Sequence, residues 1–377
     1  ISTEAFIAAN RFGLGPRPGE LQLIDKNPRD WLKRQITRNT IKPPFLQGLR
    51  PASEIAQSYL QNRRNRNKDM KKEFRQAQRR AYQDSIYARA LSSTQTDTPF
   101  AERLVQFWSN HFTVSSAGRK IIGPMSVAYE TNAIRPHIFG TFENMLLSVT
   151  QHPAMLMYLD NHISMGPNSK MALKPRSGKG SCRKRGLNEN LAREILELHT
   201  LGVNGGYTQN DVTEFAKIIT GWSVGGVNTK NMRPNGFHFK RWMHEPGPKT
   251  FLGRPYENMG IAEGIDAMRF LAQHSSTANF IATKLVRHFV SDTPPQSAIK
   301  KIERVYISTK GNLAKISEAL IDLPEIWQAP FGKTKRPYEL MISTYRALGN
   351  AGFNKNRFIK TANEFRQVPF EAASPAG

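Results

Sequence analysis

Apolar residues recur along most of this chain at the three- and four-residue spacing of amphipathic helices, which predicts a mainly α fold. Helical patterns cover residues 28–36, 66–91, 99–111, 124–133, 136–149, 188–201, 208–220, 260–273, 278–291, 296–308, 312–322 and 335–349. Strand signals are few. Residues 237–244 alternate between two faces, and together with residues 249–252 they predict one small β-hairpin near residues 236–252. No domain boundary is evident, so we expect a single multi-helix domain over residues 1–377.

The most informative stretch is residues 188–222, which reads as a helix, a glycine turn and a second helix. The first helix has an apolar arc formed by Leu187, Leu191, Ile195, Leu198 and Leu201. Glu194 and His199 fall inside this arc, and a buried carboxylate is costly unless it is paired, hydrogen-bonded or bound to a metal. We therefore expect both side chains to be largely buried and to have partners from elsewhere in the fold.

The second helix of this stretch carries ordinary folding signals. Glycines at 202, 205 and 206 end the first helix and turn the chain. Thr208 then has the character of an N-cap, and Asp211 three residues later completes a capping box. The apolar repeat that follows predicts one buried face.

Five shorter blocks accompany this stretch: residues 11–13 (RFG), 107–112 (FWSNHF), 158–161 (YLDN), 244–253 (HEPGPKTFLG) and 284–286 (KLV). With these blocks the chain resembles the DUF1800 family of bacterial proteins of unknown function, from about residue 5 to residue 350. The resemblance implies a mostly helical, exported protein of the periplasm or the extracellular space. The chain begins at Ile1 rather than Met, which removal of an export signal would explain, as would a shortened chain. The resemblance supplies no catalytic residues.

The chain is strongly basic, with a formal net charge of +24. Residues 63–80 hold nine Lys and Arg against two acidic residues, and residues 166–187 hold seven without any acidic residue. The second segment is also rich in Gly, Ser and Pro, which predicts a flexible basic loop. Its candidate polyanion-binding residues are Lys170, Lys174, Arg176, Lys179, Arg183, Lys184 and Arg185. Such charge attracts an acidic polymer or an acidic partner protein, although both segments could equally be solvated surface.

Composition and known motifs exclude several classes of protein. The single cysteine, Cys182, rules out an internal disulfide framework and a thiolate-rich metal site. No apolar run reaches the roughly 18 residues of a transmembrane helix. Metalloprotease, Walker and nucleophile-elbow motifs are missing from the sequence, and the basic residues fit no nucleic-acid reader, which makes sequence-specific nucleic acid an unlikely partner.

The strongest candidate chemistry lies on the helix of residues 188–201. Asn190, Glu194 and Glu197 stand at i, i+4 and i+7, so their side chains point the same way. Two adjacent carboxylates raise the pKa of one of them or hold a cation between them, and His199 lies on the same helix. The alternative is structural, with Glu197 paired to Arg193.

Histidines could complete such a site. His111, His238 and His244 are the candidate ligands for a divalent metal, because neutral imidazole is the commonest metal ligand. Two functional hypotheses stay open. The first is an enzyme of acid/base or metal-assisted chemistry, with Asn190, Glu194, Glu197 and His199 as its catalytic residues, acting on an envelope or secreted substrate. The second is a non-catalytic scaffold that binds an acidic polymer or an acidic partner protein.

Overall fold

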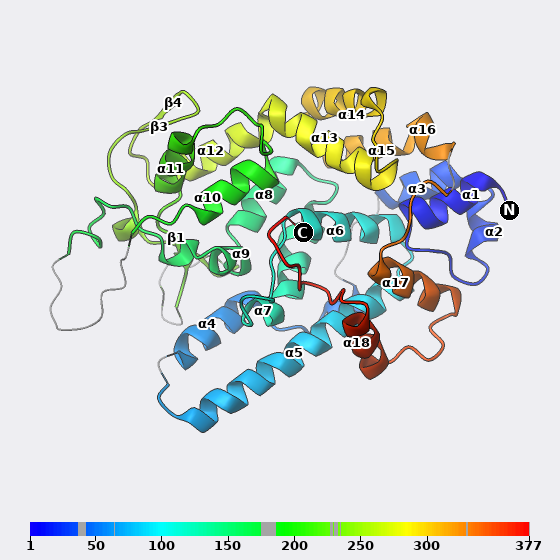
Figure 1. Ribbon diagram of the computed structural model, residues 1–377, viewed down its shortest axis with the longest axis horizontal. Coiled ribbons are helices and arrows are strands. Elements are labelled where there is room, and N and C mark those ends of the chain that lie inside the picture. The colour runs from blue at the N-terminus through cyan, green and yellow to red at the C-terminus, as the bar shows by residue number, and fades with distance from the viewer. Residues whose placement is uncertain are drawn as a thin grey trace.

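The computed structural model describes residues 1–36, 43–63, 65–174, 186–226, 229, 233, 235–328 and 331–376. Helices dominate these parts of the chain, and four short strands lie at one end of the molecule (Figure 1). The mainly α fold class predicted by the apolar spacing is confirmed. No helix in the described ranges is both long and apolar enough to cross a membrane.

The first half of the chain contributes helices α1 to α9 and two π-helical turns, η1 and η3. Their bounds are α1 Thr3–Ile7, η1 Ala8–Phe12, α2 Glu20–Ile24, α3 Pro28–Ile36, α4 Ala52–Asn62, α5 Lys68–Gln95, α6 Pro99–His111, α7 Ile122–Tyr129, η3 Glu130–Ile134, α8 Phe142–Thr150 and α9 Pro153–Tyr158. Three single 3₁₀ turns are η2 Pro44–Leu46, η4 Arg135–His137 and η5 Asn161–Ile163.

The second half contributes the remaining helices and all the strands. The helical elements are α10 Asn190–Glu194, η6 Ile195–His199 (π), α11 Gln209–Ile218, η7 Arg241–Met243 (3₁₀), α12 Ile261–Gln273, α13 Ser275–Phe289, α14 Gln296–Ser308, α15 Leu313–Ile321, α16 Pro324–Trp327, α17 Pro337–Ala347 and α18 Lys355–Glu364. The strands are β1 Trp222–Val224, β2 Phe237–Phe239, β3 Lys249–Phe251 and β4 Arg254–Tyr256.

The strands form two small antiparallel hairpins, β1 with β2 and β3 with β4. The expected pairing of residues 237–244 with residues 249–252 is therefore not the one observed. Residues 241–243 wind into the 3₁₀ turn η7, and the glycine at 247 takes a positive φ of 83°, so the chain turns away before β3 begins. The capping box at α11 is confirmed, since Asp211 Oδ2 accepts from the Thr208 amide at 2.8 Å.

Helix α6 runs through the middle of the molecule (Figure 1), and 11 of its 13 residues are buried. Its apolar side chains, among them Phe100 and Trp108, belong to the main core cluster. Buried charges on α6 are paired, because Arg135 Nη1 donates to Glu102 Oε2 at 2.8 Å. Burying a charge without a partner would cost several kcal/mol, so this pairing lets a polar helix occupy the centre.

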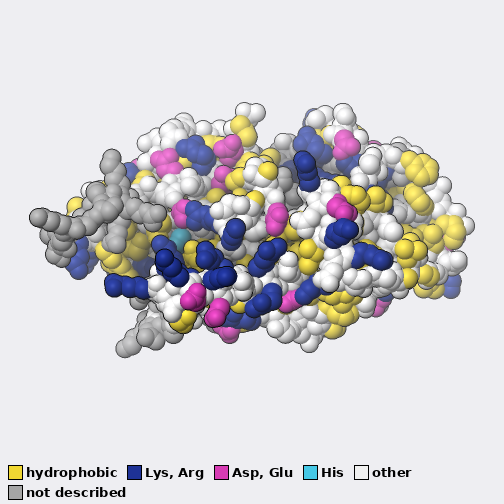
Figure 2. All heavy atoms as spheres, turned by 60° about the horizontal axis from the view of Figure 1, so that its bottom comes forward, with side chains coloured by type: hydrophobic (Ala, Val, Ile, Leu, Met, Phe, Trp, Pro, Cys, Tyr) yellow, Lys and Arg dark blue, Asp and Glu magenta, His cyan; other side chains and the backbone are white. Residues whose placement is uncertain are grey.

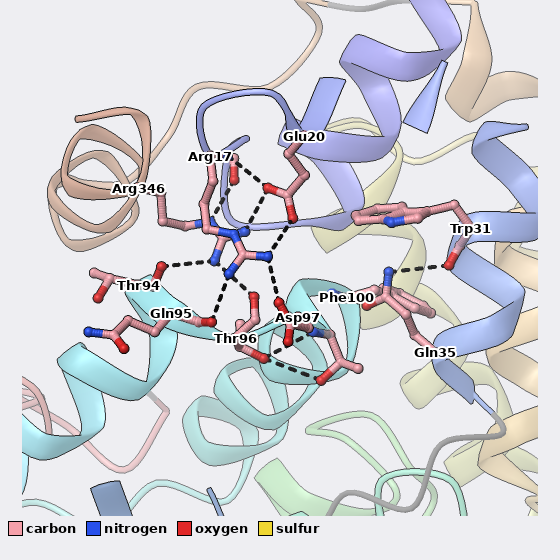
Figure 3. Close-up of polar contacts among 12 residues, drawn as sticks. Arg17, Glu20, Trp31, Gln35, Thr94, Gln95, Thr96, Asp97, Phe100 and Arg346 are labelled. Carbon is pink, nitrogen blue, oxygen red and sulfur yellow. Dashed lines mark hydrogen bonds and ion pairs between the residues drawn. The ribbon is translucent and has the colours of Figure 1, made fainter. Parts of the chain in front are cut away.

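Arg346 joins three distant segments of the chain (Figure 3). Its guanidinium is fully buried and donates to the Gly15 carbonyl at 2.6 Å, to the Thr94 carbonyl at 3.2 Å and to Glu20 Oε2 at 3.0 Å. Arg17 extends the network by donating to Asp97 Oδ1 at 2.6 Å. The network holds α17 against the N-terminal segment and the end of α5, next to the cavity described below.

The first half of α5 stands away from the core. Its apolar stripe is poorly covered, since Met70 is 54% exposed and Ala77 is exposed. The exposed residues Lys68, Lys72, Arg75 and Arg79 stand at i, i+4, i+7 and i+11, so they form one basic stripe along this half of the helix. Figure 2 looks onto the side of the molecule where α4 and α5 run, and Lys and Arg side chains gather in a band across it.

Candidate functional site

The predicted catalytic residues lie on α10 and η6, where the structure departs from a regular α-helix. Residues 195–199 form a π turn, which changes the helical phase that a single regular helix would give. His199 is buried as expected, at 2% exposure. Glu194 is only half-buried, because it lies at the edge of the apolar arc, and Asn190 is exposed.

Glu194 and Glu197 are close enough to interact. Burial and then the neighbouring Glu197 raise the pKa of the Glu194 carboxyl. The acidic pair also acts on the nearby Tyr207. Burial and then the charge of Glu197 raise the pKa of the Tyr207 hydroxyl. The sequence led us to expect a partner for Glu194. For one of its carboxylate oxygens this is wrong, because Oε2 is buried without a hydrogen bond to any described residue.

Arg193 does not neutralise this carboxylate pair in the expected way. Its Nη2 lies 3.1 Å from Glu189 Oε2 and donates to Gln209 Oε1 at 2.8 Å. The alternative of a Glu197–Arg193 ion pair is therefore not observed in the described part of the chain. The two carboxylates remain a half-buried acidic pair.

The three candidate metal-binding histidines occupy three different environments. His111 Nε2 hydrogen-bonds the His199 carbonyl at 3.1 Å, and the His238 ring lies beside Trp242. His244 Nε2 is 3.3 Å from Glu263 Oε1, and Lys249 Nζ is 2.8 Å from the other oxygen of that carboxylate. Within the described residues no three His, Cys, Asp or Glu side chains come together as a set of metal ligands. The expected convergence of these histidines on Glu194 and Glu197 is thus not observed.

The predicted basic loop of residues 166–187 is anchored at its beginning. The Met171 amide donates to the Trp242 carbonyl at 2.9 Å, and the Asn168 amide donates to Glu245 Oε2 at 2.9 Å. Flexibility is therefore not expected for residues 166–173. Lys170 and Lys174 are exposed. The other five candidate polyanion-binding residues, Arg176, Lys179, Arg183, Lys184 and Arg185, lie outside the described residues.

A cavity of about 780 Å³ lies elsewhere, between α6, α13, residues 331–339 and the C-terminal residues 366–373. In Figure 1 the red C-terminal segment runs below α6 and ends beside it. We call it the cationic cavity, because nine Lys and Arg line it against three acidic residues. The basic residues are Arg11, Arg89, Arg103, Lys284, Arg287, Lys333, Lys335, Arg336 and Arg366, and the acidic ones are Asp292, Glu339 and Glu371.

Some of these cations are neutralised within the protein. Arg89 Nε lies 2.8 Å from Glu130 Oε1, Arg103 Nη2 lies 3.2 Å from Glu339 Oε1, and Lys333 forms an ion pair with Asp292. In each of these ion pairs a carboxylate balances the positive charge, so the presence of these three cations is explained by the fold. They leave other cations of the wall to be explained.

Lys284, Arg287 and Arg336 have no such partner. No carboxylate of the described chain lies within 4 Å of any of the three cationic groups, yet they lie close to one another. Burial, followed by Arg287 and then Arg336, lowers the pKa of Lys284 to about 8. Lys335, whose Nζ donates to Asn10 Oδ1 at 2.9 Å, also has a pKa lowered to about 8, by burial and then by Arg103.

Neutral imidazoles and aromatic rings lie near Lys284, and of these His288 and Phe107 line the cavity. Burial, and then Lys284 itself, lowers the pKa of His199 to about 3 and that of His111 well below its usual value. Burial likewise keeps His288 neutral, and its Nε2 has no hydrogen-bond partner within the described ranges. The wall therefore offers positive charge, neutral imidazole and the ring of Phe107, which suits an anionic ligand with an apolar part.

Three of the five shorter sequence blocks noted above meet at this place. The cavity is lined by Arg11 of the RFG block, by Phe107, Ser109 and Asn110 of the FWSNHF block, and by Lys284 of the KLV block. The family described as "Protein of unknown function (DUF1800)" matches residues 7–377. The chain belongs to the DUF1800 family. No match is found among curated proteins or solved structures.

Membership of the DUF1800 family leaves the chemistry open, so the geometry must suggest it. The sequence did not reveal the cationic cavity, because its lining residues come from six separate segments and none has unusual spacing. One signal was available. Lys284, Arg287 and His288 break the apolar pattern of α13 beside the KLV block, and residues 333–336 carry three cations. Three of the shorter blocks thus reach the cavity, whereas the acidic pair lies in the longer stretch of residues 188–222.

Proposed function

We propose that this protein binds a ligand carrying several negative charges in the cationic cavity. What supports this most directly is the meeting of Lys284, Arg287 and Arg336, none of which forms an ion pair with a described carboxylate. Like charges repel one another, so grouping these three cations raises the free energy of the folded protein unless an anion lies between them. A bound anion removes this repulsion and gains attraction from each cation.

The composition of the wall narrows the ligand class. Arginine guanidinium groups bind carboxylate, phosphate and sulfate groups through two parallel hydrogen bonds. Ser109 and Asn110 add neutral hydrogen-bonding groups, while Phe107 and Phe331 add apolar surface. The cavity of about 780 Å³ is large enough for a segment of an acidic polymer or for acidic side chains of a partner protein. Of the two functional hypotheses that the sequence left open, this proposal corresponds to the non-catalytic, binding one.

Calorimetry with inorganic tripolyphosphate at constant ionic strength tests the proposal. We expect binding by the unaltered protein and at least a tenfold loss in the double variant Arg287→Gln/Arg336→Gln, since each charge-assisted hydrogen bond contributes roughly 1.5–3 kcal/mol. Both residues are exposed, so the variant should fold. Lys300→Gln, an exposed residue of α14 away from the cavity, is the matched control. Equal affinity in all three proteins would overturn the proposal.

A second function is supported by the acidic pair on α10. The raised pKa of Glu194 and its unpartnered Oε2 are the properties of a carboxyl group that transfers protons. This is the acid/base hypothesis, with Glu197 as the neighbouring carboxylate, and a divalent cation could sit between the two. Titration of the Glu194 carboxyl by carbon NMR, with and without Mn²⁺ in a parallel calorimetric experiment, tests it. An ordinary pKa together with no Mn²⁺ binding would remove this candidate.

Export to the periplasm or beyond is the location that we propose, on the strength of the family resemblance. The natural full-length protein, detected by antibody after fractionation of its host cells, should appear in the envelope or secreted fraction. Recovery with cytoplasmic markers alone would contradict the proposed location without affecting the proposed anion binding.

A further inference from the structure

Lys284 differs from the other lysines of the cationic cavity in having no polar partner. Its Nζ lies 5.4 Å from the centre of the Phe280 ring, and no hydrogen bond or ion pair to another described residue holds it. Lys333, by contrast, is ion-paired with Asp292, and Lys335 is bound to the side chain of Asn10. Lys284 therefore lines the cavity with an amine that no hydrogen bond or ion pair to a described residue occupies.

Two cationic neighbours, Arg287 and Arg336, disfavour a positive charge on Lys284. Arg287 stands on the same helix and Arg336 just before α17, while the buried imidazoles of His111 and His199 come from α6 and η6. Together with burial, this setting lowers the pKa of Lys284 to about 8 from 10.5. At pH 7 its neutral fraction then exceeds that of an ordinary lysine by about 300-fold.

We infer that Lys284 is a nucleophilic amine that captures the carbonyl group of an anionic ligand as an imine. The inference rests on the proposed anion binding and adds the class of ligand, an aldehyde or 2-oxo acid whose negative group is held by Arg287 and Arg336. The nitrogen lone pair of neutral Lys284 attacks the carbonyl carbon, and a proton moves from nitrogen to oxygen. Loss of water then forms the C=N bond. Amine and carbonyl compound thus give imine and one water, with no redox step.

Two aldehydes distinguish this reaction from ordinary lysine chemistry. Glyoxylate is anionic and acetaldehyde is neutral, and cyanoborohydride reduces either imine to a stable secondary amine that mass spectrometry can map. With glyoxylate near pH 7 we expect Lys284 to be labelled at least tenfold faster than Lys333, its ion-paired neighbour in the cavity, and than the exposed Lys300. Acetaldehyde should show a smaller preference for Lys284, because only the anion is concentrated by Arg287 and Arg336.

Variants separate the parts of the inference. Arg336→Gln should reduce glyoxylate labelling of Lys284 while leaving acetaldehyde labelling of the same residue within about twofold. Lys284→Arg keeps the charge but removes the nucleophile, so it should retain tripolyphosphate binding and lose the fast label. Labelling of Lys284 at or below the rate of Lys300 would overturn the inference. If tripolyphosphate still binds in that case, the proposed anion binding stands, whereas fast labelling without tripolyphosphate binding would overturn the proposed function alone.

Discussion

The ring of His111 donates a hydrogen bond from Nε2 to the main-chain carbonyl of His199, at 3.1 Å. This contact joins the end of α6 to the end of the π turn η6, so the FWSNHF block supports the helix that carries the acidic pair. A carbonyl oxygen only accepts, which fixes the hydrogen of the neutral ring on Nε2. The two buried imidazoles thus act first as packing and orienting groups.

These histidines make the stability of the protein fall in mild acid. Burial lowers the pKa of His199 to about 3 and that of His111 well below 6.5, whereas both have ordinary values in the unfolded chain. The unfolded chain therefore binds more protons, and stability present above pH 6.5 is lost as the pH falls toward 3, by up to about 1.4 kcal/mol per pH unit and group. Urea unfolding at pH 7, 6 and 5 measures this loss. His199→Gln should show a shallower dependence, and an unchanged slope would contradict the assignment.

Arg346 is expected to be the most sensitive charged residue of the fold. Arg346→Met should reduce the free energy of unfolding by roughly 3–5 kcal/mol, because it leaves Glu20 and several buried carbonyls without their donor. Arg17→Met is the matched control in the same network, and its partly exposed ion pair should cost about 1 kcal/mol or less. Chemical denaturation of both variants gives the comparison. Similar losses would mean that the network is not centred on Arg346.

Glu194 and Glu189 should respond in opposite ways to the same substitution. Burial and Glu197 raise the pKa of Glu194, so its charge at pH 7 opposes folding, and Glu194→Gln should leave stability equal or higher. The hydrogen bond from Thr213, with others, lowers the pKa of Glu189, so Glu189→Gln should cost stability at pH 7. Thermal unfolding of both variants at pH 7 is sufficient. A clear loss on Glu194→Gln would reveal a partner that needs the negative charge.

The fold was predictable from the sequence wherever apolar spacing and caps agree. The patterns predicted over residues 260–273 and 296–308 place α12 and α14 almost to the residue, and Thr208 with Asp211 places the start of α11. Strand pairing was not predictable in this way, because Phe237 and Phe239 pair with β1, whose residues carry no alternation. The burial of Glu194 was overestimated. A helical wheel gives the direction in which a side chain points, but it does not tell whether a neighbouring helix extends far enough to cover that side chain.

The cationic cavity was harder to predict than either. Arg11 lies near the N-terminus, far in the sequence from Lys284 and Arg336, and only the tertiary packing brings the three residues to one cavity. Their local patterns resemble solvated basic positions such as Lys300. The family blocks indicated residues that could be functional, but only the tertiary packing shows that several of these residues line one cavity.

The exposed stripe on α5 should bind long polyanions independently of the cavity. Lys72, Arg75 and Arg79 are exposed, lie on one face and form no ion pair with any described residue. The triple variant Lys72→Gln/Arg75→Gln/Arg79→Gln should keep its fold and its tripolyphosphate affinity. Its affinity for long-chain polyphosphate should fall, and the slope of log affinity against log salt should become shallower by about 2 to 3, because each contact contributes roughly 0.7–0.9.

A second triple variant removes the same charge from another surface and separates a stripe effect from net charge. Lys300→Gln/Arg304→Gln/Lys315→Gln alters exposed residues of α14 and α15. At 0.15 M salt, charges farther than about 8 Å from the polymer are largely screened, so this variant should keep the steep salt slope. Polyphosphate affinity measured over a salt series for both variants decides the matter. Equal losses would assign the effect to the overall charge of +24 and leave the α5 stripe as ordinary solvated surface.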